Sequence, residues 1–283
     1  RTNSSPMNPT ANNILIRTLS GLVLLAVVLG TVLLSVWSFG ILLAVIGGGS
    51  IWEFYRIAAA TGLAPQRGFG TALGIALIAG GLTVAAGVCP PAVLAAFIPL
   101  TAAVFIAELY RKKENPLGNI AVTLAGVLYA TLPLALLPFV GIREAGDEIL
   151  YRPWVILSYI FIVWSNDIGA FLTGSALGRH RLFERISPKK SWEGFAGGIV
   201  AAVGVAILAG RMQGGDPLLW GALGAVVAVS GVWGDLVESM FKRSVGIKDS
   251  GRMMPGHGGF LDRFDAMLIS APFVFVYFII FTL

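Results

Sequence analysis

The chain has 283 residues, of which 56% are hydrophobic and only 12% are charged. A water-soluble domain of this length would leave too much apolar surface uncovered, so the composition indicates a membrane protein. The formal net charge of +5 would suit a nucleic-acid-binding domain. An excess of basic residues is, however, also typical of cytosolic loops in membrane proteins, and we expect no nucleic-acid partner.

Nine apolar stretches follow one another along the chain, and most approach the roughly 20 residues with which a helix crosses a bilayer. Continuous apolar runs, unlike alternating ones, favour helices over the strands of a membrane barrel. The sequence therefore predicts an all-α, polytopic integral membrane protein with about nine transmembrane helices. The expected spans are 18–37, 39–58, 69–88, 91–107, 119–140, 153–174, 193–210, 217–241 and 265–283.

The distribution of basic residues predicts the orientation. With the N-terminus in the cytosol, all of the 20 Lys and Arg residues lie on the cytosolic side except Arg143, Arg152 and Arg211. Cytoplasmic loops of membrane proteins carry such an excess. We therefore expect a cytosolic N-terminus and a multi-pass protein of the bacterial cytoplasmic (inner) membrane.

The chain is expected to form one membrane domain, 1–283, with scaffold helices in about 1–150 and catalytic helices and cytosolic loops in about 151–283. In the first part, Glu53 lies beside aromatic residues and close to Arg56. An aromatic and ion-pair anchor at the membrane surface explains this cluster without chemistry. On this interpretation Glu53 has no catalytic role.

Carboxylates within or at the ends of apolar stretches mark the last third of the chain. A charge buried in a bilayer costs several kcal/mol unless a partner offsets it. Each carboxylate could simply pair with a nearby base, but the group as a whole favours a cation. Oxygen donors favour Mg²⁺ over zinc, and the chain has only one Cys and two His. The carboxylates are Asp167, Asp235, Glu238, Asp262 and Asp265.

Their positions predict a common cavity. Asp262 and Asp265 are three residues apart and share a face if this segment is helical. Asp167 and Asp235 each precede the cytosolic end of a span by about seven residues, or about 10 Å of helix. We therefore expect Asp167 and Asp235 at similar depth, where they could face one polar cavity.

Polar stretches rich in Lys, Arg and Ser at 187–194, 239–243 and 248–251 suit phosphate groups, although basic residues at a membrane edge can also serve topology alone. The loop Pro255–Gly259 runs into the last span, and a helix N-terminus after glycines offers free N–H groups to a phosphate. His257 in this loop could satisfy loop hydrogen bonds, position phosphate or move a proton.

Three stretches resemble the phosphatidate cytidylyltransferases, also called CDP-diacylglycerol synthases. The most specific is residues 239–265, from Ser239-Met240-Phe241-Lys242-Arg243 to Leu261-Asp262-Arg263-Phe264-Asp265. Residues 164–171 and 187–191 add to the resemblance. The N-terminal spans are similar only in hydrophobicity and in a Trp-Glu-Phe cluster, and Met254 stands where another apolar residue is expected.

This resemblance implies an enzyme, a nucleotidyltransferase of phospholipid biosynthesis. Its reaction is CTP plus phosphatidate giving CDP-diacylglycerol and pyrophosphate, with Mg²⁺ in a site that could hold two ions. The lipid phosphate would attack the α-phosphorus of CTP, so no nucleophilic side chain is required. The resemblance also implies a homodimer in the lipid bilayer with its active site on the cytosolic side.

The resemblance further implies roles for individual residues. The metal would be held by Asp235, Asp262 and Asp265. Catalytic roles fall to Lys242, Arg243, Asp249, His257 and Arg263. Substrate binding falls to Asp167, Ser187, Lys189, Lys190, Ser191, Ser239, Lys248, Gly258 and Gly259.

Two other functions remain open at this point. Intramembrane aspartates also mark the pathways of ion-coupled transporters, but the charged motifs here gather in one half and on one side. A related enzyme could join a different nucleotide or a different lipid phosphate. For any lipid substrate we expect a lateral opening near the last two spans.

Overall fold

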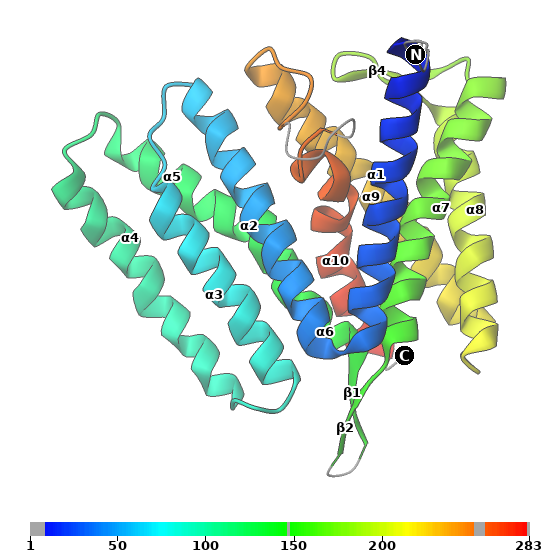
Figure 1. The fold of residues 1–283 in the computed structure, drawn as a ribbon, viewed down its shortest axis with the longest axis horizontal. Helices are drawn as coiled ribbons and strands as arrows, with labels where there is room; N and C mark the ends of the chain where they lie inside the picture. Colours follow the sequence, from blue (N-terminus) through cyan, green and yellow to red (C-terminus); the bar gives the residue numbers. More distant parts are fainter. Residues whose placement is uncertain (1–8, 146–147, 252–257, 282–283) are drawn as a thin grey trace, which may run out of the picture.

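The computed structural model describes residues 9–145, 148–251 and 258–281. These residues form a helical bundle with two short hairpins (Figure 1). The helices are α1 (Pro9–Leu34), α2 (Val36–Ala60), α3 (Arg67–Ala85), η1 (Pro91–Ala96), α4 (Phe97–Arg111), α5 (Pro116–Gly126), η2 (Val127–Thr131), α6 (Leu132–Gly141), α7 (Pro153–Leu177), α8 (Trp192–Met212), α9 (Pro217–Ser244) and α10 (Leu261–Phe281).

The predicted all-α, polytopic architecture is confirmed. Within the described ranges, eight helical segments are long and apolar enough to cross a membrane, including η1 with α4 and the continuous segment α5–η2–α6. The apolar part of α1, Thr18–Leu34, is shorter and accounts for the first of the nine expected spans. Each expected span therefore corresponds to a helix.

Two antiparallel hairpins were not predicted. β1 (Ile142–Ala145) pairs with β2 (Glu148–Tyr151), and β3 (Arg181–Phe183) pairs with β4 (Ser187–Ser191). Both lie between spans, where the sequence analysis expected only loops. β4 leads directly into α8, and the Ser191 hydroxyl caps that helix by accepting from the Gly194 N–H at 3.1 Å. The second hairpin therefore holds the polar stretch 187–191 against the end of the bundle.

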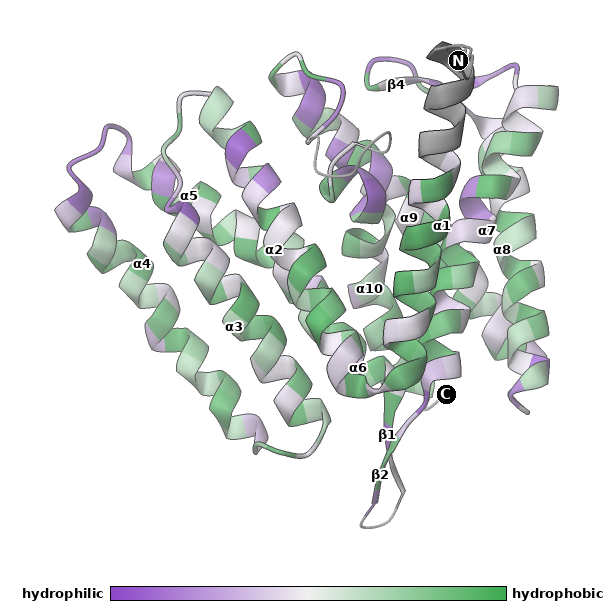
Figure 2. Cartoon of the chain, viewed as in Figure 1, coloured by the Kyte–Doolittle hydropathy of each residue, from purple (hydrophilic) through white to green (hydrophobic). Residues whose placement is uncertain are grey.

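The connections α2–α3, α4–α5 and α7–α8 lie at the same end of the bundle as the start of α1 (Figure 1). The opposite end carries the β1–β2 hairpin and the end of α10. Figure 2 shows hydrophilic residues gathered at the first end and mostly hydrophobic residues along the helices between the two ends. The basic stretches that define the expected cytosolic side therefore share one end of the molecule.

Small residues allow α7, α8, α9 and α10 to pack closely. A side chain at Gly234 of α9 would collide with the backbone of α10 at Asp265 and Ala266. Likewise, one at Gly169 of α7 would collide with α8 at Gly197. Such close approach stabilises helix pairs in a bilayer, where no hydrophobic force drives them together. The packing also brings polar residues on these four helices close to one another.

Candidate active site

A cavity of about 530 Å³ opens at the hydrophilic end of the bundle, between α7, the β3–β4 hairpin, α8 and α9. Asp167 and Asp235 both line it, which confirms that the two aspartates face one cavity. Lys189, Lys190 and Ser191 line it from β4. The cavity thus combines basic and acidic side chains from segments far apart in the sequence.

Lys190 and Asp235 join the hairpin to α9. The Lys190 Nζ lies 2.6 Å from Asp235 Oδ2. Ser239, one helical turn after Asp235, donates its hydroxyl to Asp235 Oδ1 at 3.2 Å. The Lys190 and Asp235 side chains keep 24% and 41% of their surface exposed, so incoming polar groups can reach the pair.

A third carboxylate, Asp265 of α10, adds to the negative charge beside this pair. Asp265 interacts electrostatically with both Asp235 and Asp167. Lys190 offsets part of this charge. The Asp265 Oδ1 atom also accepts the N–H of Ala266 at 2.7 Å. Carboxylates from α7, α9 and α10 therefore converge where few donors neutralise them, which favours binding of a further cation.

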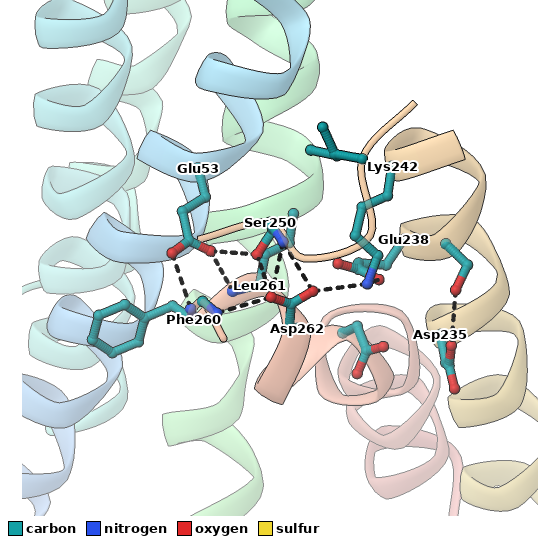
Figure 3. A network of polar contacts seen from close by, with 12 residues as sticks. Glu53, Asp235, Glu238, Lys242, Ser250, Phe260, Leu261 and Asp262 are labelled. Atoms are coloured by element: carbon teal, nitrogen blue, oxygen red, sulfur yellow. Dashed lines mark hydrogen bonds and ion pairs between the residues drawn. The ribbon is translucent and has the colours of Figure 1, made fainter. Parts of the chain in front are cut away.

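Asp262 has different surroundings although it lies one turn from Asp265. Its Oδ1 atom accepts from Lys242 Nζ at 2.7 Å, and its Oδ2 atom accepts from the Ser250 hydroxyl at 3.0 Å and the Gly259 N–H at 2.8 Å. The Ser250 N–H also points to this carboxylate, at 2.9 Å from Oδ2. Figure 3 shows these groups converging on Asp262. Both carboxylate oxygens are thus engaged.

Lys242 lies between two carboxylates. Its Nζ atom is 2.5 Å from Glu238 Oε2, one turn earlier on α9, as well as 2.7 Å from Asp262. Only 11% of the Lys242 side chain is exposed. The pair of anions holds this ammonium group at a defined place between α9 and α10 (Figure 3).

Glu53 of α2 is the residue that sequence reasoning interpreted wrongly. It is 1% exposed and accepts from the Ser250 hydroxyl at 2.7 Å, the Phe260 N–H at 3.1 Å and the Leu261 N–H at 2.9 Å. The first N–H groups of a helix lack internal partners, and Glu53 supplies the acceptor for two at α10. Arg56, its expected ion-pair partner, donates instead to the Ser250 carbonyl. No local sequence signal links Glu53 to a segment about 200 residues away.

Unpaired polar atoms mark two residues to which the sequence analysis gave no role, Asn166 and Tyr129, and one carboxylate that it had included, Glu238. Among the described residues, Asn166 Oδ1, Tyr129 Oη and Glu238 Oε1 are buried without a hydrogen-bond partner. Asn166 lines the main cavity. Tyr129 lies in the π-helical segment η2 and interacts electrostatically with Asp265, Glu238 and Asp235. Since buried polar atoms are normally paired, these atoms are candidates to contact a bound group.

Several predicted site residues are not among the described residues that line the main cavity. Lys248 and Asp249 are exposed in the connection after α9, and the exposed Arg243 donates to the Ile247 carbonyl at 3.0 Å. Ser187 lies on β4 but does not line the main cavity. Arg263 lines a second, narrow cavity together with Asp167.

The glycine loop differs from the expected free phosphate-binding loop. The Gly259 N–H is not free, because Asp262 accepts it, and the N–H groups of the next two residues point to Glu53. Gly258 has φ +85°, a conformation that glycine adopts most easily. His257 lies outside the described residues, so its predicted role has no structural counterpart here.

The chemistry of one cluster of carboxylates, but not a preformed geometry, suits a hard cation. Asp235, Asp265 and Asp167 offer oxygens and an excess of negative charge, as Mg²⁺ prefers. To coordinate the same ion, the Asp262 carboxylate would have to give up its contact with Lys242 or its hydrogen bonds from Ser250 and Gly259. In the part of the chain that the structure describes, no three acidic, His or Cys side chains form a compact preformed metal site.

Comparisons with known proteins agree with these features. A sequence model of the cytidylyltransferase family matches residues 15–281. The phosphatidate cytidylyltransferase of Haemophilus influenzae is 42% identical over 161 residues, 52% of this chain and 55% of that protein. That of Mycobacterium bovis is 43% identical over 119 residues, 42% of this chain and 39% of that protein. These alignments span about half or less of the relatives' length.

A third relative aligns nearly from end to end. The phosphatidate cytidylyltransferase of Synechocystis sp. is 32% identical over 288 residues, 93% of this chain and 96% of that protein. The similarity therefore includes the N-terminal helices as well as the segments that line the cavity.

Proposed function

Because the chain belongs to the cytidylyltransferase family, we propose that it transfers the cytidylyl group of CTP to phosphatidate, giving CDP-diacylglycerol and pyrophosphate. The observation that carries this proposal is the cavity in which Lys190 meets Asp235 at the hydrophilic end of apolar helices. A nucleotide can enter such a cavity from water while a lipid stays in the bilayer.

The reaction needs alignment and charge balance more than a reactive side chain. An oxygen of the lipid phosphate forms a bond to the α-phosphorus of CTP, and the bond from that phosphorus to the bridging oxygen of the β-phosphate breaks. The electron pair of the broken bond leaves with pyrophosphate. Both reactants are anions, so cationic groups that gather them and neutralise charge supply much of the catalysis.

Two lysines supply positive charge in different ways. Lys190 is partly exposed in the main cavity and can exchange Asp235 for a phosphate of CTP. Lys189 and Ser191 line the same cavity and are assigned to the nucleotide as well. Lys242 is held between Glu238 and Asp262 and provides a fixed positive charge at the junction of α9 and α10.

Residues outside the cavity lining are assigned to the phosphates and to the lipid head group. Arg243 lies in the last turn of α9, and Lys248 and Asp249 follow that helix. All three are exposed, on the side from which the triphosphate would enter. Arg263 stands at the start of α10 and is assigned to the phosphate of phosphatidate.

We assign Mg²⁺ to Asp235 and Asp265, with Asp167 completing the negative charge around it. When bound, Mg²⁺ neutralises phosphate oxygens and aligns the attacking and leaving groups. Asp262 was predicted as a third metal ligand. We assign it a positioning role instead, because it holds Lys242 and Ser250 in place.

The cellular setting is part of the proposal. The end of the bundle with the basic stretches would face the cytosol of a bacterial cell, in accord with the positive-inside rule, and α1 would begin there. The homodimer remains a prediction from the family resemblance.

The test is pyrophosphate release by the purified protein in detergent, with phosphatidate and Mg²⁺, comparing CTP with ATP, GTP and UTP. We expect release that is selective for CTP, requires the lipid and stops when EDTA removes the metal. Absence of release with every nucleotide, from protein shown to be folded, would contradict the proposal. Solute flux across liposomes by the same protein would then favour the transporter alternative.

A further inference from the structure

A groove of about 930 Å³ lies beside the β1–β2 hairpin, at the opposite end of the bundle from the proposed active site (Figure 1). Its lining comes from the end of α3, the connection to η1, the end of α6, β1 and the last turns of α10. Of the described lining residues only Ala85 and Val140 are buried. The groove is therefore open along one side and has room for a large ligand.

The groove is apolar except at one point. Phe139 of α6 and Phe275 of α10 meet edge to face within it, with ring centroids 5.9 Å apart. Arg143 of β1 is the only charged residue in the described lining. An apolar groove that carries a single guanidinium matches an amphipathic anion, whose alkyl chains would lie along the helices and whose charged group would lie at Arg143.

The hairpin fixes the place of Arg143. The Tyr151 hydroxyl of β2 donates to the Val32 carbonyl of α1 at 2.8 Å. A side chain at Gly87 would collide with Ile149 of β2, so the hairpin also packs closely on the connection between α3 and η1. These contacts hold β1, and with it the backbone of Arg143, at the mouth of the groove.

The charge of Arg143 favours an anion at this place. Among the side chains that the structure describes, Arg143 forms no ion pair with a carboxylate. Burial and the nearby charge of Arg143 lower the pKa of Arg152, which begins the next helix. Two positive charges therefore repel each other beside the groove, and an anionic group bound there would reduce this repulsion.

We propose that this groove binds an anionic phospholipid, with its phosphate at Arg143 and its acyl chains along α3, α6 and α10. This lipid is not the substrate, because the groove and the main cavity lie at opposite ends of the bundle and share no described lining residue. In the proposed orientation it belongs to the extracytoplasmic leaflet. The inference goes beyond the proposed function and does not depend on it.

The selectivity of such a site comes from the charged contact. Bilayer chains are as apolar as the groove, so moving a chain into it gains little free energy. A guanidinium binds the phosphate of any phospholipid, but the choline group of phosphatidylcholine would bring a further positive charge close to two arginines. We therefore expect phosphatidylglycerol to bind about fivefold more tightly than phosphatidylcholine.

Cys89 provides the probe, because it lines the groove and is the only cysteine of the chain. Its alkylation by N-ethylmaleimide in detergent is followed by mass spectrometry while dioleoyl phosphatidylglycerol or dioleoyl phosphatidylcholine is added. We expect phosphatidylglycerol to slow alkylation at about one fifth of the concentration that phosphatidylcholine requires, and inorganic phosphate to have no effect.

Three results with the wild-type protein would overturn the proposal. Equal protection of Cys89 by the two lipids would show that the groove does not select an anionic head group. Protection by inorganic phosphate alone would assign Arg143 to a free anion. Protection that rises with protein concentration without added lipid would assign the groove to a second copy of the chain.

A pair of variants tests the role of Arg143. Arg143→Gln should remove the preference, so that both lipids protect Cys89 at similar concentrations. The matched control Arg211→Gln removes the same charge from the last turn of α8, an exposed position outside the described groove lining, and should keep the preference. Because both variants lose one positive charge, the comparison also corrects for slower thiol alkylation at an anionic micelle surface.

Native mass spectrometry gives a second measurement that does not depend on the reactivity of Cys89. Bound phosphatidylglycerol should remain on the wild-type protein and on Arg211→Gln, and it should be lost more easily from Arg143→Gln. Equal retention by the two variants would overturn the assignment of the phosphate to Arg143. Neither measurement uses turnover, so a failure of the proposed function leaves this test intact.

Discussion

Two neighbouring groups of carboxylates at the hydrophilic end of the bundle differ in what surrounds them. Glu53 and Asp262 accept hydrogen bonds from Ser250, from backbone N–H groups at the start of α10 and, in the case of Asp262, from Lys242. Asp167, Asp235 and Asp265 face one another across helices, with Lys190 as the ammonium group bound to Asp235. The first group joins segments of the bundle through hydrogen bonds, and the second is the one to which we assign Mg²⁺ in the proposed function.

The difference shows that the role of a buried carboxylate depends on the hydrogen-bond donors that surround it in the folded protein, and not on its neighbours in the sequence. Asp262 and Asp265 are one helical turn apart and looked equivalent in the sequence. Among the described residues, Ser250 and Gly259 donate to Asp262, and neither donates to Asp265. Variants of the two aspartates should therefore fail in different ways.

The largest effect on activity is expected for Asp265→Asn. This change keeps the shape of the side chain but removes charge from the proposed metal site, so kcat should fall at least about a hundredfold. Stability in the absence of substrate should stay near that of the wild type, as measured by thermal unfolding in detergent. The control Glu148→Gln alters an exposed carboxylate in the hairpin at the other end of the bundle and should leave turnover unchanged. Normal turnover of Asp265→Asn would refute the metal assignment.

Asp262→Asn should lower both activity and stability. Its amide would face the donors of Ser250 and Gly259 and would leave Lys242 with Glu238 as its remaining acidic partner. Removing one member of a buried charged network costs about 3–5 kcal/mol, and we expect a loss near the lower end because part of the side chain is exposed. The measurement is urea or thermal unfolding compared with that of Asp265→Asn. Equal stability of the two variants would show that the contrast between the sites is not real.

Glu53→Gln should reduce kcat about tenfold. Glu53 lies in the first part of the chain, but it accepts from N–H groups at the start of α10, so its loss should shift that helix. The amide can still accept a hydrogen bond, but it brings N–H groups toward other donors, at a cost of about 1–3 kcal/mol. Glu53→Asp, which keeps the charge, should recover part of the activity. Glu114→Gln, an exposed change, is the matched control. A Glu53→Gln variant with lower stability but unchanged kcat would reduce the role of Glu53 to folding alone.

Lys190→Gln is expected to affect the binding of CTP and to have little effect on stability. It should raise the KM for CTP about tenfold, because one charge-assisted contact with a phosphate is lost. Such a contact contributes about 1.5–3 kcal/mol, part of which other groups would replace. Stability without substrate should change by less than about 1 kcal/mol, because the pair with Asp235 is partly exposed. Pyrophosphate release measured over a range of CTP concentrations tests this. An unchanged KM for CTP would place the triphosphate away from Lys190.

Several features of the site could be predicted from the sequence. The regular spacing along a helix put Asp167 and Asp235 at similar depth, and both line the main cavity. The polar stretch 187–191 was recognised by its Lys and Ser residues, and Lys190 does reach α9. These predictions worked because they depended on local composition and on the fixed rise of an α-helix.

Other features could not be predicted because they depend on contacts between distant segments. Glu53 was assigned an ion pair with nearby Arg56, yet both residues bind the segment around Ser250. Tyr129 looks like an ordinary membrane tyrosine in the sequence, but in the structure it lies in a π-helical segment and interacts electrostatically with three carboxylates. The β3–β4 hairpin was missed because its short strands carry little periodic pattern.

The sequence alone determined that this protein is a bundle of apolar helices with basic residues grouped between them, because hydrocarbon thickness and helix rise set the length and composition of a span. It also indicated which acidic residues lie within or near the ends of the apolar stretches. Only the tertiary structure decided which of these carboxylates accept hydrogen bonds from the protein and which remain accessible. The distinction depends on where the segment 248–251, the start of α10 and α2 come together. The tertiary structure also decided that Glu53 of an N-terminal helix accepts from the start of α10, because side-chain packing across the bundle is a long-range property that no local pattern encodes.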